Sequence, residues 1–117
     1  MKKLCVLLLL TVSLFANAKE YTFSPKDVPA MKQLLGSGNL QPGDAVVLKD
    51  GTYHNLDEIH FTGKGVSGKP IVWRAENPGK AVISGKLRLK IYGEYLQLDE
   101  LLFSKAWAIG QDMIDFQ

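Results

Sequence analysis

Cysteine is nearly absent from this chain, which has one cysteine, Cys5, among 117 residues. Cys5 lies in an apolar segment near the N-terminus that we expect to be cleaved off, and it does not stand at a lipoprotein-type cleavage site. The mature chain would then contain no cysteine. This excludes disulfide bonds, a thiolate metal site and a cysteine nucleophile.

Long hydrophobic runs are also lacking. The longest extends from Leu4 to Phe15, well short of the roughly 20 residues that a membrane-spanning helix needs. Two lysines precede this run, and the small-residue pattern Ala-Asn-Ala, which ends at Ala18, follows it. These features predict a signal peptide over residues 1–18 with cleavage after Ala18. We therefore expect a secreted or periplasmic protein without membrane contact after cleavage.

An excess of charge is missing as well. The whole chain has 14 basic and 12 acidic residues, and two of the basic residues, Lys2 and Lys3, belong to the predicted signal peptide. The remaining mature chain is close to neutral. A nucleic-acid partner is not expected, because nucleic-acid-binding domains carry a marked surplus of Lys and Arg.

A short amphipathic helix is predicted between Ser24 and Gly36. Its apolar residues recur at helical spacing, and a glycine ends it. Asp27 suits the N-cap, because Pro29 then falls in the first turn, where its missing N–H is not needed. The apolar positions are Val28, Met31, Leu34 and Leu35.

The rest of the chain consists of short strand-like segments that repeat. The segments 46–48, 71–73 and 96–98 begin 25 residues apart. A second series, 59–61, 82–83 and 101–103, follows at a spacing of about 20 to 23. Two interleaved series predict an all-β fold, a right-handed parallel β-helix (solenoid), over residues 19–117. In a sandwich, by contrast, 45–51 and 57–63 would pair as an antiparallel hairpin.

Three expectations about the solenoid follow. The helix, near residues 27–35, should lie over one end of about three coils and cover their apolar interior. The strands near Val46, Ile71 and Leu96 should be parallel neighbours in one sheet. Side chains alternate between the interior and the surface along a strand, and turns lie on the surface. We therefore expect these apolar residues to be buried: Val47, Ile59, Val72, Ile83, Leu96 and Phe103. The turn residues Lys64, Lys69 and Lys80 should be exposed.

Few residues are candidates for chemistry. The glycine-rich stretch 63–69 resembles a phosphate-binding loop, but Pro70 and a strand follow where a helix would be needed. His54 and His60 stand on separate segments without a third metal ligand, and we interpret both as surface histidines. The acidic pairs 57–58 and 99–100 alternate across a strand and are expected at coil corners.

Four basic residues remain as candidates for a groove that binds an acidic polymer. Lys86, Arg88 and Lys90 share parity in one strand, so they should project from one face, and Arg74 could join them. We predict Lys86, Arg88 and Lys90 as substrate-binding residues. Outward-facing charge is also ordinary on a solenoid, and that alternative stays open.

The region from Gln41 to Phe103 resembles the start of polysaccharide lyase family six, which contains alginate lyases and chondroitinase B. Glu100 stands where the family pattern has a glycine after Asp99, which affects one local turn. The residues that carry the resemblance are Pro42-Gly43-Asp44, Leu48 to Tyr53, Gly63 and Gly65, Lys69-Pro70-Ile71, Arg74-Ala75-Glu76, Pro78-Gly79-Lys80, Ile83-Ser84-Gly85 and Gly93 to Leu96.

The resemblance implies cleavage of a uronate polymer by β-elimination. A base, typically Lys in this family, abstracts the C5 proton, and calcium with an Arg neutralises the uronate carboxylate. It also implies that these catalytic groups and the calcium ligands stand on later coils. We therefore assign no catalytic residue and no metal ligand here, and we expect this 117-residue chain to be an inactive N-terminal portion.

Alternatives remain at this stage. The chain could instead begin a non-catalytic secreted β-helix, such as a carbohydrate-binding or adhesin-type protein, or be the product of a disrupted gene. The sequence does not choose between alginate and chondroitin or dermatan sulfate, nor between endo and exo action. The oligomeric state is also left open.

Overall fold

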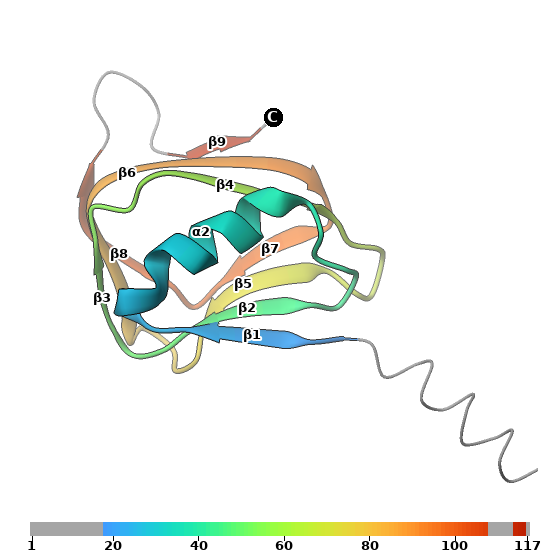
Figure 1. Cartoon of the computed structure of the whole chain (residues 1–117), viewed down its shortest axis with the longest axis horizontal. Coiled ribbons are helices and arrows are strands. Elements are labelled where there is room, and N and C mark those ends of the chain that lie inside the picture. The colour runs from blue at the N-terminus through green and yellow to red at the C-terminus, as the bar shows by residue number, and fades with distance from the viewer. Residues whose placement is uncertain (1–17, 108–113, 117) are drawn as a thin grey trace, which may run out of the picture.

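The computed structural model describes residues 18–107 and 114–116, which form mostly β-strands and one short α-helix (Figure 1). No helix in these two ranges is long and apolar enough to cross a membrane. The predicted signal peptide, Ala18 apart, lies outside the described residues. The elements in chain order are β1 (Glu20–Phe23), the 3-10 helix η1 (Pro25–Asp27), α2 (Val28–Ser37), β2 (Ala45–Leu48), β3 (Gly51–His54), β4 (Asp57–Lys64), β5 (Ile71–Ala75), β6 (Ala81–Glu94), β7 (Leu96–Asp99), β8 (Leu102–Trp107) and β9 (Ile114–Phe116).

One parallel sheet has the strand order β1-β2-β5-β7. Ile71 is in register with Leu96, as the 25-residue spacing predicts. Val46, however, is in register with Trp73 and not with Ile71, because the first repeat is two residues longer. The prediction that these three strands are parallel neighbours is confirmed. The short strand β1 was not foreseen, and it pairs with β2 on the side away from β5.

The second parallel sheet is organised around the long strand β6. The first half of β6 pairs with β3 and β8, and its second half pairs with β4 and β9. The sequence predicted two separate strands here, but they form one that is irregular near Gly85, where φ is +79°. In the second predicted series, 82–83 does pair with 102–103, but Ile59 is in register with Leu89, so 59–61 and 82–83 are not neighbours. The antiparallel hairpin does not form, since β2 and β4 belong to different sheets.

The apolar core lies between the two sheets, where β4 and β6 face β2, β5 and β7 (Figure 1). Phe61 of β4 meets Trp73 of β5 edge to face, with ring centroids 6.1 Å apart and planes at 75°. Such a pair adds roughly 1 kcal/mol beyond the area that it buries. This contact ties the two sheets together at the centre of the core.

The predictions of buried residues are confirmed at three of six positions, and those of exposed lysines at all three. Val47, Ile59 and Ile83 are buried, and Leu96 and Phe103 are half-buried against the core. Val72 is also only half-buried, so its predicted burial is wrong, because its neighbours Ile71 and Trp73 take the inward positions of β5. All three lysines expected on the surface are exposed, namely Lys64, Lys69 and Lys80.

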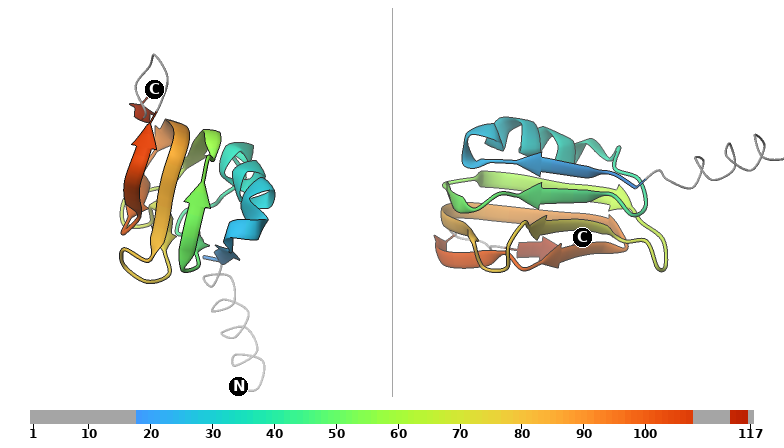
Figure 2. Two further views of the ribbon diagram at one scale, coloured as in Figure 1. Left: turned by 90° about the vertical axis from the view of Figure 1, so that its left-hand side faces the viewer. Right: turned by 90° about the horizontal axis from the view of Figure 1, so that it is seen from below.

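The helix α2 lies across one end of the strands, as predicted (Figure 2). Met31 and Leu35 are fully buried, whereas Val28 and Leu34 are packed at the margin of the core. The prediction that Gly36 ends the helix is wrong, because α2 continues through Gly36 to Ser37 and stops before Gly38, where φ is +75°. Asp27 is the N-cap residue by position, but its carboxylate accepts hydrogen bonds from the backbone N and the hydroxyl of Ser24 instead of capping α2 (3.1 and 2.9 Å).

Two local features settle expectations about the turns. The glycine-rich stretch makes a tight turn closed by Val66 and Lys69, and it leads into β5. Asp57 and Glu100 have φ of +61° at the start of β4 and after β7, which places both acidic pairs at corners. Glu100 therefore adopts the left-handed conformation that a glycine would occupy more easily.

Candidate functional site

The second half of β6 carries the three predicted substrate-binding residues on one face. Lys86, Arg88 and Lys90 alternate with Leu87, Leu89 and Ile91, whose side chains are buried. The prediction that the three cations project from a single face is thus confirmed. Their role toward a substrate stays a prediction.

The three cations do not have the same surroundings. Lys90 Nζ lies 3.5 Å from the Glu58 carboxylate, whereas Lys86 is exposed and is in register with Trp107 of β8. Arg88 is half-buried, and its Nε has no hydrogen-bond partner among the described residues. Arg74 is separate from all three: it lies on β5 in the other sheet and pairs with Glu20 at 3.0 Å.

A hydrogen-bonded network joins β4 to β6 beside Lys90. His60 Nε2 lies 2.7 Å from Glu58 Oε1, and His60 Nδ1 lies 3.1 Å from the Tyr92 hydroxyl. The His60 and Tyr92 rings meet edge to face at 5.9 Å. The hydrogen bond from His60 and, next, the charge of Lys90 hold the pKa of Glu58 below its ordinary value of 4.5.

Sequence reasoning missed this network and interpreted His60 as a solvated histidine. One signal was available, because Glu58 and His60 are two apart on a strand and therefore share a face. The partner Tyr92 is 32 residues from His60, so it could be found only from the register of β4 with β6. His54 lies elsewhere, on β3, where its Nδ1 is 2.9 Å from the Ser84 hydroxyl.

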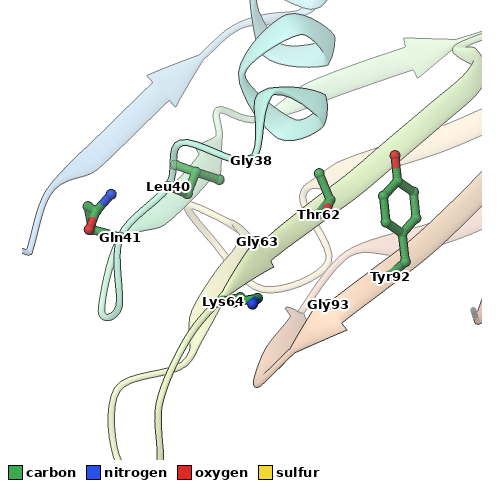
Figure 3. Close-up of a pocket in the computed structure, with 8 residues that line it drawn as sticks. All are labelled: Gly38, Leu40, Gln41, Thr62, Gly63, Lys64, Tyr92 and Gly93. Atoms are coloured by element: carbon green, nitrogen blue, oxygen red, sulfur yellow. The ribbon is translucent and has the colours of Figure 1, made fainter.

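Two adjoining hollows run along this network and meet at Tyr92. The first lies between α2 and β4 and is lined by Lys32, Gln33, Gly36, Glu58, His60 and Tyr92. The second continues toward the ends of β4 and β6 and is lined by Gly38, Leu40, Gln41, Thr62, Gly63, Lys64, Tyr92 and Gly93. Figure 3 shows Thr62 and Tyr92 on neighbouring strands, on the same side of the sheet. We call the two hollows together the helix–sheet groove.

The described residues include no group of three or more His, Cys, Asp or Glu side chains that could hold a metal ion. Calcium needs several oxygen ligands that converge on one point. The described part of the chain therefore does not fit a calcium site, and the acidic residues at the corners are dispersed.

In each sheet, every repeat adds a parallel strand beside the strand of the preceding repeat, and a helix covers one end of the stack. This arrangement is typical of repeat proteins built from stacked parallel strands. A family model described as Chondroitinase B matches residues 30–117. The chain belongs to this family. A comparison with curated proteins gave no match.

Solved structures agree with this assignment. A mannuronic acid specific polysaccharide family 6 lyase from human gut microbiota is 94% identical, with a TM-score of 0.83 over 85% of this chain and 22% of its own. The PL6 family alginate lyase AlyGC is 26% identical, with a TM-score of 0.65 over 81% of this chain and 12% of its own. A PL6 alginate lyase in complex with a trisaccharide is 27% identical, with a TM-score of 0.59 over 80% of this chain and 18% of its own. The chain thus spans less than a quarter of each.

Proposed function

We propose that this chain forms the N-terminal part of a secreted polysaccharide lyase that cleaves mannuronate-rich alginate by β-elimination. The observation that carries the proposal is the 94% identity with a lyase specific for mannuronic acid. Chondroitin and dermatan sulfate are the weaker candidates, because the family description alone points to them.

In this proposal, this chain and the rest of the protein supply different parts of the enzyme. β-Elimination needs a base at the C5 proton and a group that neutralises the uronate carboxylate in the transition state. No metal-binding group of side chains is present among the described residues, so calcium and the groups around it belong to later coils in this account. This chain supplies the first strands and the helix that covers their end.

A closed right-handed solenoid is part of the same proposal. Its support is the order in which each parallel strand adds to the preceding repeat in both sheets. Several large apolar side chains are exposed on the strands farthest from α2, where a further coil would cover them. They are Tyr95 beside β7, Leu102 and Trp107 on β8, and Phe116 on β9.

Export through a signal peptide at residues 1–18 is also proposed. The support is in the sequence, where two lysines, the apolar run from Leu4 to Phe15 and the small-residue pattern that ends at Ala18 follow one another. N-terminal sequencing of the exported protein would test the cleavage position.

The activity is tested on the complete protein that carries this chain. We expect absorbance of unsaturated uronate ends to increase on polymannuronate, more slowly on polyguluronate, and not on chondroitin or dermatan sulfate. Removal of calcium with a chelator should slow the reaction, and added calcium should restore it. Binding of polymannuronate without any increase in absorbance would overturn the proposal and favour the non-catalytic carbohydrate-binding alternative.

A further inference from the structure

We propose that the helix–sheet groove is a binding site for an extended acidic saccharide chain. The choice of a uronate polymer as its ligand rests on the proposed function. The groove itself rests on its own side chains, all of which belong to the described residues.

The charge of the groove favours an anion. The Glu58 carboxylate is already engaged by His60 and Lys90, at 2.7 and 3.5 Å, so its charge is offset. Lys32 and Lys64 are the lysines that line the groove, and Lys32 Nζ donates a hydrogen bond to the Leu56 carbonyl oxygen at 2.9 Å. Glu94 is in register with Lys64 and offsets one of the two charges, so one positive charge remains in excess. Lys64 is exposed, and its ammonium has no ion-pair or hydrogen-bond partner in the described part of the chain, so it is available to a carboxylate.

The neutral groups of the groove suit sugar hydroxyls. Gln33 and Thr62 make no side-chain hydrogen bond to any described residue, so both retain their donors and acceptors. Tyr92 is half-buried where the two hollows meet, and its hydroxyl is held by His60. A fixed aromatic side chain between free polar groups gives a ligand both an apolar surface and directional contacts.

The shape of the groove suits an extended chain. His60 and Lys64 are four strand positions apart, or about 13 Å at roughly 3.3 Å per residue. Gly36 and Gly38 border the groove from the helix side without side chains that would fill it. A Cβ at Gly36 would be 3.7 Å from His60, which is ordinary contact, so a larger side chain there would extend into the first hollow.

Four variants of the complete protein test the site. Lys64→Ala removes the free ammonium, and Lys80→Ala is its control, because Lys80 is an exposed lysine on the turn before β6. Gly36→Trp fills the first hollow, and Gly36→Ala is its control, because both change the helix at the same position. Circular dichroism and the unfolding midpoint establish which variants are folded.

Two readouts measure binding of the polymer and turnover by the same variants. In native gels that contain polymannuronate, Lys64→Ala and Gly36→Trp should bind about fivefold more weakly than their controls, and carboxyl-reduced polymannuronate should not distinguish Lys64→Ala from Lys80→Ala. In kinetic assays, the same two variants should have a higher KM for the long polymer. Their kcat and their KM for a mannuronate trimer should be unchanged.

Equal binding by each variant and its control would contradict the proposal that the groove binds the polymer. A loss of trimer turnover in folded Lys64→Ala would contradict it as well. Failure of the proposed function would look different. In that case the protein would cleave no uronate polymer and still bind polymannuronate more weakly in Lys64→Ala than in Lys80→Ala. That result would support the groove as a binding site and contradict the proposed lyase function.

Discussion

His60 Nδ1 lies 3.1 Å from the Tyr92 hydroxyl and so connects β4 to β6 on the outward face of their sheet. The same ring contacts Glu58 through Nε2 at 2.7 Å. One histidine therefore fixes the rotamers of an acid and a phenol on adjacent strands. The face that carries Lys90 and borders the helix–sheet groove is held in place by this contact.

Stability should depend on pH through Glu58. Its pKa is lowered by the hydrogen bond from His60, so the folded state favours the carboxylate. The stabilisation is present above the unfolded-state pKa, about 4.5, and is lost as pH falls through the lower folded-state pKa. Denaturant midpoints measured below about pH 5 should decline less steeply in Glu58→Gln than in the unmodified protein. Glu76→Gln, at an exposed carboxylate, should leave the decline unchanged, and identical pH profiles for both variants would contradict this account.

The bend in β6 depends on glycine at position 85. Gly85 has φ +79°, and a Cβ there would overlap Asn55 Oδ1 and lie 2.8 Å from the His54 ring. Asn55 Oδ1 accepts a hydrogen bond from the Lys86 backbone N at 2.8 Å, which the overlap would break. Gly85→Ala should therefore reduce the free energy of unfolding by roughly 3 kcal/mol, as strain of the left-handed backbone and a lost hydrogen bond combine.

Gly79→Ala is the matched control for that measurement. Gly79 has φ +71°, and nothing lies within 4 Å of a Cβ built there. Its cost should be only the backbone strain, about 1 to 2 kcal/mol. Equal losses at the two positions would show that Asn55 does not set the requirement for glycine at 85.

A buried phenol joins the start of the chain to the corner between β2 and β3. The Tyr53 hydroxyl lies 2.8 Å from the Lys49 carbonyl oxygen and 3.1 Å from the Phe23 carbonyl oxygen. Tyr53→Phe should reduce the free energy of unfolding by about 1 to 2 kcal/mol, because these acceptors lose their donor. Tyr21→Phe should change it little, since the Tyr21 hydroxyl has no partner among the described residues. Chemical denaturation of both variants makes the comparison.

The same phenol should weaken the fold in alkali. Burial, and then the charge of Asp27, raises the pKa of Tyr53 to about 12 from 10.0. The folded state therefore keeps the proton while the unfolded state loses it, and stability falls as pH rises from about 10 toward 12. Tyr53→Phe should remove this part of the alkaline decline. If stability declines equally in the variant, the alkaline decline is caused by titrating groups other than Tyr53.

Residues 19–117, the predicted mature chain, should not depolymerise alginate or dermatan sulfate by themselves. In the proposed function the base and the groups that neutralise the carboxylate belong to later coils, and β-elimination requires both. Ultraviolet absorbance with calcium present measures the outcome. Turnover that disappears when Lys86, Arg88 and Lys90 are changed to Ala would contradict this expectation and place a working site on β6.

The sequence was sufficient for the parallel strands, the helix and the shared face of Lys86, Arg88 and Lys90, because each depends on local alternation or spacing. It was insufficient where several apolar residues are consecutive. Ile71, Val72 and Trp73 give no alternation, so the inward positions of β5 could not be chosen. β1 was missed because its four residues follow the predicted signal peptide and have no preceding repeat to align with.

The site was harder to predict than the fold. The contact of His60 with Tyr92 depends on the pairing of two strands that are far apart in the sequence. The helix–sheet groove depends in addition on how α2 lies against β4. Neither relationship leaves a periodic signal, whereas the family resemblance is carried by turn residues whose spacing is visible directly.

Mass spectrometry of the oligosaccharides that the complete protein releases from polymannuronate, in water enriched in heavy oxygen, tests the central claim most directly. β-Elimination predicts products that are lighter by one water than hydrolysis products, with an unsaturated non-reducing end and no oxygen label introduced by cleavage. Saturated products that carry one oxygen atom from solvent for each bond cleaved would contradict the assignment as a lyase.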